Sequence, residues 1–162
     1  MIQKKVDWQT FHRDCLRLAE LIKAGGENYR RLICISRGGL VVGAVLGHIL
    51  NFRNISTVGM LLYDDTASRS DVEIITSPDL PSPGSSLLVV DDLVDSGRTL
   101  AYLSEAWGKR YRLHFAVLYD KGGGAIRPTF RVEDQPEVWI HFPWEDTASE
   151  LSLPPESPAS GL

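Results

Sequence analysis

Apolar and polar positions follow one another in a pattern that predicts helices and strands in turn. After Asp7, apolar residues recur every three or four positions, which puts them on one face of a helix. Asp7 can accept hydrogen bonds from the first free N–H groups of this helix, and Gly25 with Gly26 can end it. The apolar residues are Trp8, Phe11, Cys15, Leu18 and Ile22. The pattern therefore predicts an amphipathic opening helix.

Two later segments share one layout, in which an apolar run leads through a turn into a helical stretch. In the first segment, the run 32–35 is followed by a glycine turn at 36–39 and by small apolar residues up to position 50. In the second, the run 87–90 is followed by an acidic turn and by helical spacing over 97–107. Short unbroken apolar runs of this kind are typical of strands buried on both faces.

Three further runs, 55–63, 113–119 and 138–142, predict strands, and a link with Gly and Pro separates the last two. The polar stretch 64–86 contains three prolines and predicts a long loop, which in compact domains is often a lid. Alternating strands and helices predict an α/β fold with a mainly parallel sheet covered on both faces. Ligands of such sheets bind at the carboxyl ends of the strands.

Composition adds bounds on size and location. With 162 residues, of which 43% are hydrophobic, we expect one domain over about 1–150, followed by a Pro- and Ser-rich disordered tail at 151–162. The longest apolar stretch begins at Leu40 and is far shorter than the roughly 20 residues of a membrane span. No signal-peptide core is visible near the N-terminus, so we expect a soluble cytoplasmic protein.

Charge and metal-ligating residues exclude other classes of partner. Lys and Arg number 17 against 21 Asp and Glu, and this net charge of −4 argues against a surface for nucleic acid or anionic lipid. Cys15 and Cys34 fall on predicted core positions without the spacing of a metal or redox pair, so we expect ordinary buried thiols. The four histidines are scattered, and we expect no transition-metal site.

The acidic turn carries two kinds of chemistry. Asp91 and Asp92 can accept hydrogen bonds from sugar hydroxyls or hold Mg²⁺ through its waters. The residues Ser96 to Thr99 offer N–H groups, hydroxyls, an arginine and a helix N-terminus, which suit a phosphate. A phosphorylated ribose needs both the hydroxyl-accepting carboxylates and the phosphate-binding turn. The other interpretation is a purely structural turn. A single aspartate would be enough to cap a helix, however, whereas the three carboxylates of Asp91, Asp92 and Asp95 repel one another, which is a cost that a structural turn would not need.

The segment 87–99 resembles the phosphoribosyl pyrophosphate (PRPP) binding motif of the type I phosphoribosyltransferases. The motif has thirteen positions, and this segment fills every one of them. In order, it consists of four apolar residues, two acids, an apolar residue, any residue, an acid, Ser or Thr, Gly, a variable residue and Thr. The resemblance implies the fold of that family, a mainly parallel central sheet flanked by helices. It also implies a flexible loop, here about 64–86, and a small C-terminal hood, here about 121–146.

The same resemblance assigns roles to the residues of this motif. Asp91 and Asp92 would hold the ribose hydroxyls, with Asp91 also the residue for Mg²⁺. Asp95 would be the general base that accepts a proton from the purine. The loop for the 5-phosphate would consist of Ser96, Gly97, Arg98 and Thr99, although Arg98 stands where close relatives of the family have glycine.

The turn Ser36, Arg37, Gly38 and Gly39 is a second candidate for phosphate binding. Glycines let a phosphate approach the backbone and arginine supplies a cationic fork, although a glycine turn before a helix is also common as a structural element. In the family this loop binds the pyrophosphate of PRPP, often through a non-proline cis peptide, and the sequence resembles that of the xanthine-guanine enzymes. Arg69, the cation of the segment 64–86, would assist there.

Lys121, Trp139 and Ile140 are the candidates for binding a base. Taken alone, Lys121 beside three glycines fits a solvated loop, and Trp139 fits a core position. The resemblance to xanthine-guanine enzymes, which extends to the ending from His141 to Asp146, implies other roles. Lys121 would donate to the purine 6-oxo group, Trp139 would stack on the ring, and backbone groups of Ile140 would read the 2-position.

The resemblance implies a purine phosphoribosyltransferase of salvage metabolism that uses Mg²⁺ and forms a homodimer or homotetramer. Its substrates would be PRPP and guanine, xanthine or hypoxanthine. Two alternatives stay open at this stage. One is a PRPP-binding regulator, since the fold also serves RNA- or DNA-binding proteins; the other is a transferase for a different base, such as hypoxanthine alone, a pyrimidine or nicotinate. Lys121 disfavours adenine, whose 6-amino group matches an ammonium donor poorly.

Overall fold

The computed structural model describes residues 2–62 and 72–146. Arg69 and the expected tail at 151–162 therefore lie outside the described residues. In the described part, six strands form a central sheet in the order β4-β3-β2-β5-β6-β7. Their bounds are β2 (Arg31–Ser36), β3 (Ile55–Leu62), β4 (Val72–Thr76), β5 (Ser86–Val94), β6 (Arg112–Asp120) and β7 (Phe130–Asp134).

The central sheet is mainly parallel, as the alternation of strands and helices predicts. β2 pairs in parallel with β3 and β5, and β6 pairs in parallel with β5 and β7. β4 runs antiparallel to β3 and forms one edge of the sheet. The helices are α1 (Trp8–Ala24), α2 (Gly38–Ile49) and α3 (Arg98–Trp107). No described helix is both long and apolar enough to span a membrane.

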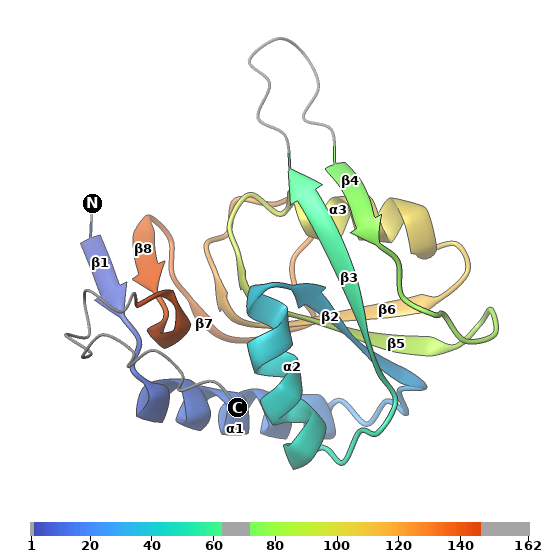
Figure 1. Ribbon diagram of the computed structural model, residues 1–162, viewed down its shortest axis with the longest axis horizontal. Helices are drawn as coiled ribbons and strands as arrows, with labels where there is room; N and C mark the ends of the chain where they lie inside the picture. Colours follow the sequence, from blue (N-terminus) through green and yellow to red (C-terminus); the bar gives the residue numbers. More distant parts are fainter. Residues whose placement is uncertain (1, 63–71, 147–162) are drawn as a thin grey trace, which may run out of the picture.

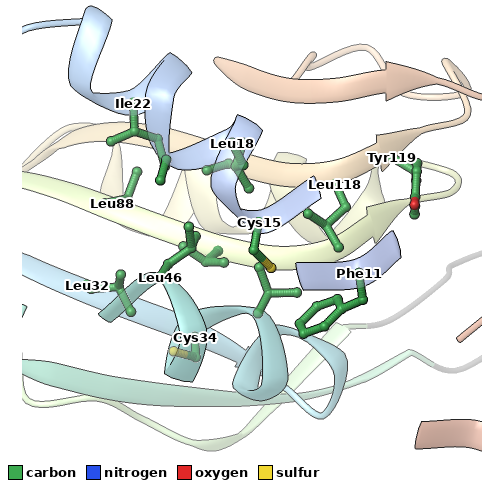
Figure 2. Packing of buried hydrophobic residues seen from close by; sticks show 14 of the residues in the cluster. Phe11, Cys15, Leu18, Ile22, Leu32, Cys34, Leu46, Leu88, Leu118 and Tyr119 are labelled. Atoms are coloured by element: carbon green, nitrogen blue, oxygen red, sulfur yellow. The ribbon is translucent and has the colours of Figure 1, made fainter. Parts of the chain in front are cut away.

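Helices cover the sheet on both faces (Figure 1). The apolar strands accordingly have buried side chains in two separate core clusters. Leu88 and Val90 of β5 pack with α1 and α2, whereas Leu87 and Val89 pack with α3. Figure 2 shows the first of these cores, where side chains of α1 point toward α2 and the sheet. The sheet and its two helical layers thus hold the strand ends in fixed positions.

The opening helix and the cysteines agree with the sequence pattern. The Asp7 carboxylate accepts a hydrogen bond from the Thr10 N–H over 2.7 Å, so the predicted cap is formed. Cys15 and Cys34 are buried and free. Burial raises the pKa of the Cys15 thiol to about 12 and that of Cys34 to about 11, which keeps both thiols protonated and unreactive.

Two departures from the predicted elements concern edge strands. The prediction of an unbroken loop over 64–86 is wrong at 72–76, which forms β4, and at Ser86, which begins β5. The link between 119 and 138 contains β7. Both β4 and β7 lie at edges of the sheet, where many of their side chains are exposed or half-buried. Such strands lack the continuous apolar run that marks a central strand.

A third departure concerns the expected hood. The predicted strand 138–142 is present as β8 (Val138–His141), but it pairs in parallel with β1 (Ile2–Lys5), a strand that was not predicted. β7, although it lies within 121–146, belongs to the central sheet. The small sheet of β1 and β8 stands to one side of the central sheet in Figure 1 and continues into a 3-10 turn (Pro143–Glu145). This small sheet therefore combines both ends of the described chain.

Candidate active site

The two turns singled out in the sequence meet at one crevice. β2 and β5 are parallel neighbours, with Cys34 opposite Val90, so the turns that follow them emerge at the same edge. From these two strands the chain continues in opposite directions, to β3 on one side and to β6 on the other. Such a reversal of strand order opens a crevice at the carboxyl ends of parallel strands.

The glycines of the first turn are required by how closely it packs on the second. A Cβ on Gly38 would lie 1.9 Å from Oδ2 of Asp92, and one on Gly39 would lie 2.4 Å from the carbonyl oxygen of Val90. No side chain can occupy that space. The peptide bond between Ser36 and Arg37 is cis, as the resemblance implied, and the Arg37 side chain is exposed at the crevice.

Asp91 and Asp92 are held close together by the backbone. The Asp92 N–H donates to Asp91 Oδ1 over 2.9 Å, and the Leu93 N–H donates to Asp92 Oδ1 over 2.7 Å. Burial raises the pKa of both carboxyls; the Asp92 charge raises the pKa of Asp91 further, and Glu145 adds to that of Asp92. A cation or a pair of hydroxyl donors would offset this unfavourable arrangement of charge.

This acidic pair fits a magnesium ion that arrives with a phosphorylated substrate. Mg²⁺ keeps several waters and binds one or two protein carboxylates together with substrate phosphates. Across residues 2–62 and 72–146, no group of three or more His, Cys, Asp or Glu side chains forms a ready-made metal cage. The donor set of Asp91 and Asp92 therefore suits Mg²⁺ shared with a ligand rather than a resident ion.

A cavity of about 710 Å³ lies over these residues. Its lining residues are Ser36, Arg37, Gly38, Asp91, Asp92, Trp144 and Glu145. Trp144 and Glu145 had no assigned role in the sequence analysis, although they belong to the segment 141–146 that carried the resemblance. The Phe142 N–H donates to the Glu145 carboxylate over 2.8 Å, and Trp144 stacks on Phe142 with a centroid distance of 4.5 Å. These contacts hold the 3-10 turn over the cavity.

The turn before α3 is shaped for an anion. Gly97 has a φ of 74°, a backbone conformation that favours glycine, and α3 starts at Arg98 without a capping side chain from any described residue. Ser96 is exposed, and Thr99 is half-buried beside it. Helix N-termini attract phosphate groups, because the first N–H groups of a helix have no partner within the helix and its positive end favours an anion.

A second glycine turn, which carried no predicted role, supports this anion site. A Cβ on Gly97 would lie 2.5 Å from Cα of Gly124, and one on Gly124 would lie 2.8 Å from Cα of Gly97. A Cβ on Gly123 would lie 2.7 Å from the carbonyl oxygen of Asp95. The run of glycines after Lys121 thus packs directly on residues 95–97. A glycine run beside a lysine was the signal available in the sequence.

Lys121 joins the candidate base-binding residues to Asp95. Its Nζ lies 3.4 Å from Asp95 Oδ1 and 5.6 Å from the centre of the Trp139 ring. The Lys121 side chain is only 15% exposed, whereas that of Asp95 is 71% exposed and faces solvent. Ile140 is buried, so its side chain is part of the core and its backbone alone could contact a ligand. An ammonium, a carboxylate and an indole therefore meet beside the anion site.

Comparison with known proteins identifies the family. The phosphoribosyl transferase domain matches residues 6–148, which is most of the chain. The chain belongs to this family.

The phosphoribosyltransferase is similar to several named purine enzymes. It is 36% identical to the xanthine-guanine phosphoribosyltransferase of Idiomarina loihiensis over 141 residues, which cover 86% of this chain and 85% of that protein. The xanthine-guanine-hypoxanthine phosphoribosyltransferase of Helicobacter pylori has a similar structure (TM-score 0.80, 25% identity), with 93% of this chain and 98% of that one covered. The purine phosphoribosyltransferase of Pyrococcus horikoshii also has a similar structure, with a TM-score of 0.78 and 26% sequence identity. That comparison covers 91% of this chain and 96% of the other.

In this phosphoribosyltransferase, most of the residues expected at the site lie at the crevice. The turns 36–39 and 91–99 meet there, and Lys121 reaches Asp95 and Trp139. Arg98 is half-buried at the start of α3. The expected role of Arg69 stays a prediction, because that residue lies outside the described part.

Proposed function

We propose that this phosphoribosyltransferase moves the 5-phosphoribosyl group from PRPP to a 6-oxopurine, releasing pyrophosphate, as an enzyme of purine salvage. The observation that carries the proposal is the meeting of Lys121, Asp95 and Trp139 beside the anion-binding turn. An ammonium suits the 6-oxo group of guanine, xanthine or hypoxanthine, and an indole suits the face of a purine ring. The relatives named above are purine enzymes, which supports the same conclusion.

The residues of the crevice divide between the parts of PRPP. Ser96 to Thr99 and the N-terminus of α3 would bind the 5-phosphate, because the positive end of a helix favours an anion. Asp91 and Asp92 would accept hydrogen bonds from the ribose hydroxyls, and Asp91 would also hold Mg²⁺. That ion supplies charge stabilisation for the departing pyrophosphate when it is bound. The turn Ser36, Arg37, Gly38 and Gly39 would bind the pyrophosphate, and Arg69 is proposed to assist it.

The base would lie between Lys121 and the Trp139 ring, with the backbone of Ile140 reading the 2-position. Asp95 is exposed and near Lys121, so it is the proposed general base for the N–H of the five-membered ring. As the ring nitrogen bonds to C1 of the ribose, the bond from C1 to pyrophosphate breaks and the proton passes to Asp95. Positive charge develops on the ribose and negative charge on the leaving group, so positioning and charge stabilisation carry most of the catalysis.

The test is incubation of the purified protein with PRPP, Mg²⁺ and single bases, following pyrophosphate and nucleotide. Guanine, xanthine and hypoxanthine are expected to react, and adenine, uracil and nicotinate to react at least about 100-fold more slowly, since an unmatched polar pair in a base site costs that much or more. Turnover of adenine at the rate of guanine would contradict the role of Lys121. Binding of PRPP with turnover of no base would favour a regulatory protein instead.

The proposal extends to the assembly and its location. We expect a homodimer or homotetramer in the cytoplasm, without a nucleic-acid partner, on the strength of the family resemblance and the net charge of −4. Light scattering on the purified chain measures the assembly: a mass of two or four times 18.0 kDa agrees with it, and a monomer contradicts it.

A further inference from the structure

An ion cluster outside the proposed contacts with substrate joins the ends of β6 and β7. Asp120 and Asp134 are the last residues of these strands and lie opposite each other in register. Arg127, in the connection between them, reaches both: Nε lies 2.7 Å from Asp120 Oδ2, and Nη2 donates to Asp134 Oδ1 over 2.7 Å. We call Asp120, Arg127 and Asp134 the clamp. Arg131 extends the cluster, donating to Asp134 Oδ1 over 2.8 Å.

The clamp also holds the backbone of the glycine turn. The second oxygen of Asp120, Oδ1, accepts a hydrogen bond from the Gly122 N–H over 2.8 Å. Gly122 has a φ of 77°, and a Cβ there would lie 3.2 Å from Nη1 of Arg127. The arginine therefore lies against the turn that its carboxylate partner fixes. One carboxylate thus links the guanidinium to the backbone conformation of residue 122.

Burial makes this cluster different from an ordinary surface ion pair. Exposed pairs contribute little to stability, but the Asp120 side chain is 0% exposed. Oδ2 of Asp120 forms no hydrogen bond of good geometry, but it lies 2.7 Å from the charged Nε of Arg127. The Nε of Arg131 is farther from the same oxygen, at 4.0 Å. Without Arg127 the buried charge would have to find a new partner, so the turn that shares this carboxylate would move.

The turn connects the base site with the phosphate site. Lys121 stands between Asp120 and Gly122, and its N–H donates to the Val94 carbonyl over 2.9 Å. From this anchored backbone its ammonium reaches toward Asp95. The next residues, Gly123 and Gly124, pack on the backbone of residues 95–97. A shift of the turn would therefore displace Lys121 and loosen the phosphate loop together.

We propose that Arg127 is a positioning residue: by bridging Asp120 and Asp134 it fixes the glycine turn 122–124, which aims Lys121 at the base and supports the phosphate loop at Gly97. The inference rests on the proposed function for the roles of those two sites. The position of the turn itself is a property of the free protein. It can therefore be tested separately from catalysis.

Arg127→Gln is the test variant, and Arg131→Gln is its matched control. Both remove one guanidinium from the same cluster, but Arg127 lies 2.7 Å from both aspartates, whereas Arg131 lies 4.0 Å from Asp120. Hydrogen–deuterium exchange on the free proteins, read by mass spectrometry, is expected to rise over 121–127 and 95–99 in Arg127→Gln and to stay at the wild-type level in Arg131→Gln. Unchanged exchange at 121–127 in Arg127→Gln, or an equal rise in the control, would overturn the inference, whether or not the protein turns over a base.

Steady-state kinetics then measures the consequence for the reaction. Misplacing a substrate-positioning group can cost about 100-fold, so kcat/KM for the base is expected to fall about 10- to 100-fold in Arg127→Gln and less than about 2-fold in Arg131→Gln. The KM of the base should rise more than that of PRPP, because Lys121 is bonded directly to Asp120 and Gly122. Wild-type constants in a folded Arg127→Gln protein would contradict the role.

Arg127→Lys covers the case in which Arg127→Gln does not fold. Lysine keeps the charge near Asp120 but lacks the planar fork that reaches two carboxylates, so intermediate exchange and an intermediate kcat/KM are expected. Wild-type values in Arg127→Lys would show that bridging is unnecessary. Absence of any turnover by the wild type would count against the proposed function alone, since the exchange result stands without it.

Discussion

Asp95 is an exposed carboxylate, in contrast to the half-buried pair before it. Its contact with Lys121 leaves it near both the proposed base and the phosphate loop. Asp95→Asn keeps the size of the side chain and removes its ability to accept a proton. We expect kcat to fall about 100- to 10,000-fold, the usual contribution of a general base, with the KM of PRPP within about 3-fold.

Steady-state kinetics with varied PRPP and varied base separates these effects. Glu20→Gln, an exposed change on α1, is a control that should leave both constants unchanged. Equal losses in kcat and in PRPP affinity would mean that Asp95 binds PRPP rather than accepting a proton.

At the scale of residues, the sequence predicts side chains better than it predicts backbone contacts. The segment 87–99 and Lys121 could be found because their residue types match a known chemistry in a fixed order. The packing of Gly97 on Gly124 could not, since it brings together two turns that are distant in sequence. Trp144 and Glu145 were missed for a related reason: their position over the cavity depends on where the small sheet stands.

At the scale of elements, the helices and strands that bury a regular set of apolar side chains were predictable from the sequence. β2, β5 and β6 have unbroken apolar cores, and α1 has its apolar residues on one face. β1, β4 and β7 escaped prediction because each is short and at least partly exposed. Such strands are specified by the neighbour on which they pair, which the local sequence does not contain.

The pairing of β1 with β8 predicts a link between the first residues and the base site. Gln3 lies opposite Trp139 in the register of these strands. Removing residues 1–5 takes away the described strand partner of β8, so Trp139 should lose its fixed orientation. We expect the KM of the base to rise about 10-fold or more, while the KM of PRPP changes less than about 2-fold.

The matched control for this truncation is the double variant Lys4→Gln, Lys5→Gln. It removes the two charges of β1, including the ion pairs with Glu133 and Asp146, but keeps its backbone. Wild-type base affinity in the double variant and weak affinity in the truncated protein would assign the effect to strand pairing. An unchanged KM of the base in the truncated protein would contradict it.

For the whole molecule, the net charge of −4 conceals a site of mixed sign. Arg37 and Lys121 bring positive charge to a crevice whose floor is the acidic pair Asp91 and Asp92. The pair is unfavourable in the free protein, because burial raises the pKa of both carboxyls, and the Asp92 charge raises that of Asp91 further. The folded state therefore binds protons at these two carboxyls more tightly than the unfolded state does. For that reason, the free energy of unfolding falls as the pH rises above about 4 toward the raised pKa values.

Asp91→Asn should therefore stabilise the free protein at neutral pH. The asparagine carbonyl can still accept the Asp92 N–H, but no charge is buried. We expect the Tm to rise by about 2 °C or more at pH 7.5 and the difference to vanish near pH 4, because burial penalises only the charged carboxylate and a domain of this size shifts about 2–4 °C per kcal/mol. PRPP-dependent turnover should fall sharply in the same variant.

Scanning calorimetry across this pH range makes the measurement. Asp146→Asn is the opposite control: hydrogen bonding from His141 lowers the pKa of Asp146, so its charged form stabilises the folded state above about pH 4 and its loss should lower the Tm at pH 7.5. A lower Tm for Asp91→Asn at pH 7.5 would contradict the account of the acidic pair.

The contact between Gly97 and Gly124 also limits how this enzyme can be re-engineered. A Cβ at either position would overlap the backbone of the other, so neither glycine has a tolerated single replacement without movement of a loop. A loop transplanted from a relative to alter base preference must therefore carry a glycine at the position of Gly124 and the same path across residues 95–97. Libraries that hold these two positions fixed while varying Ala125 and Ile126 keep the interlocking surface intact.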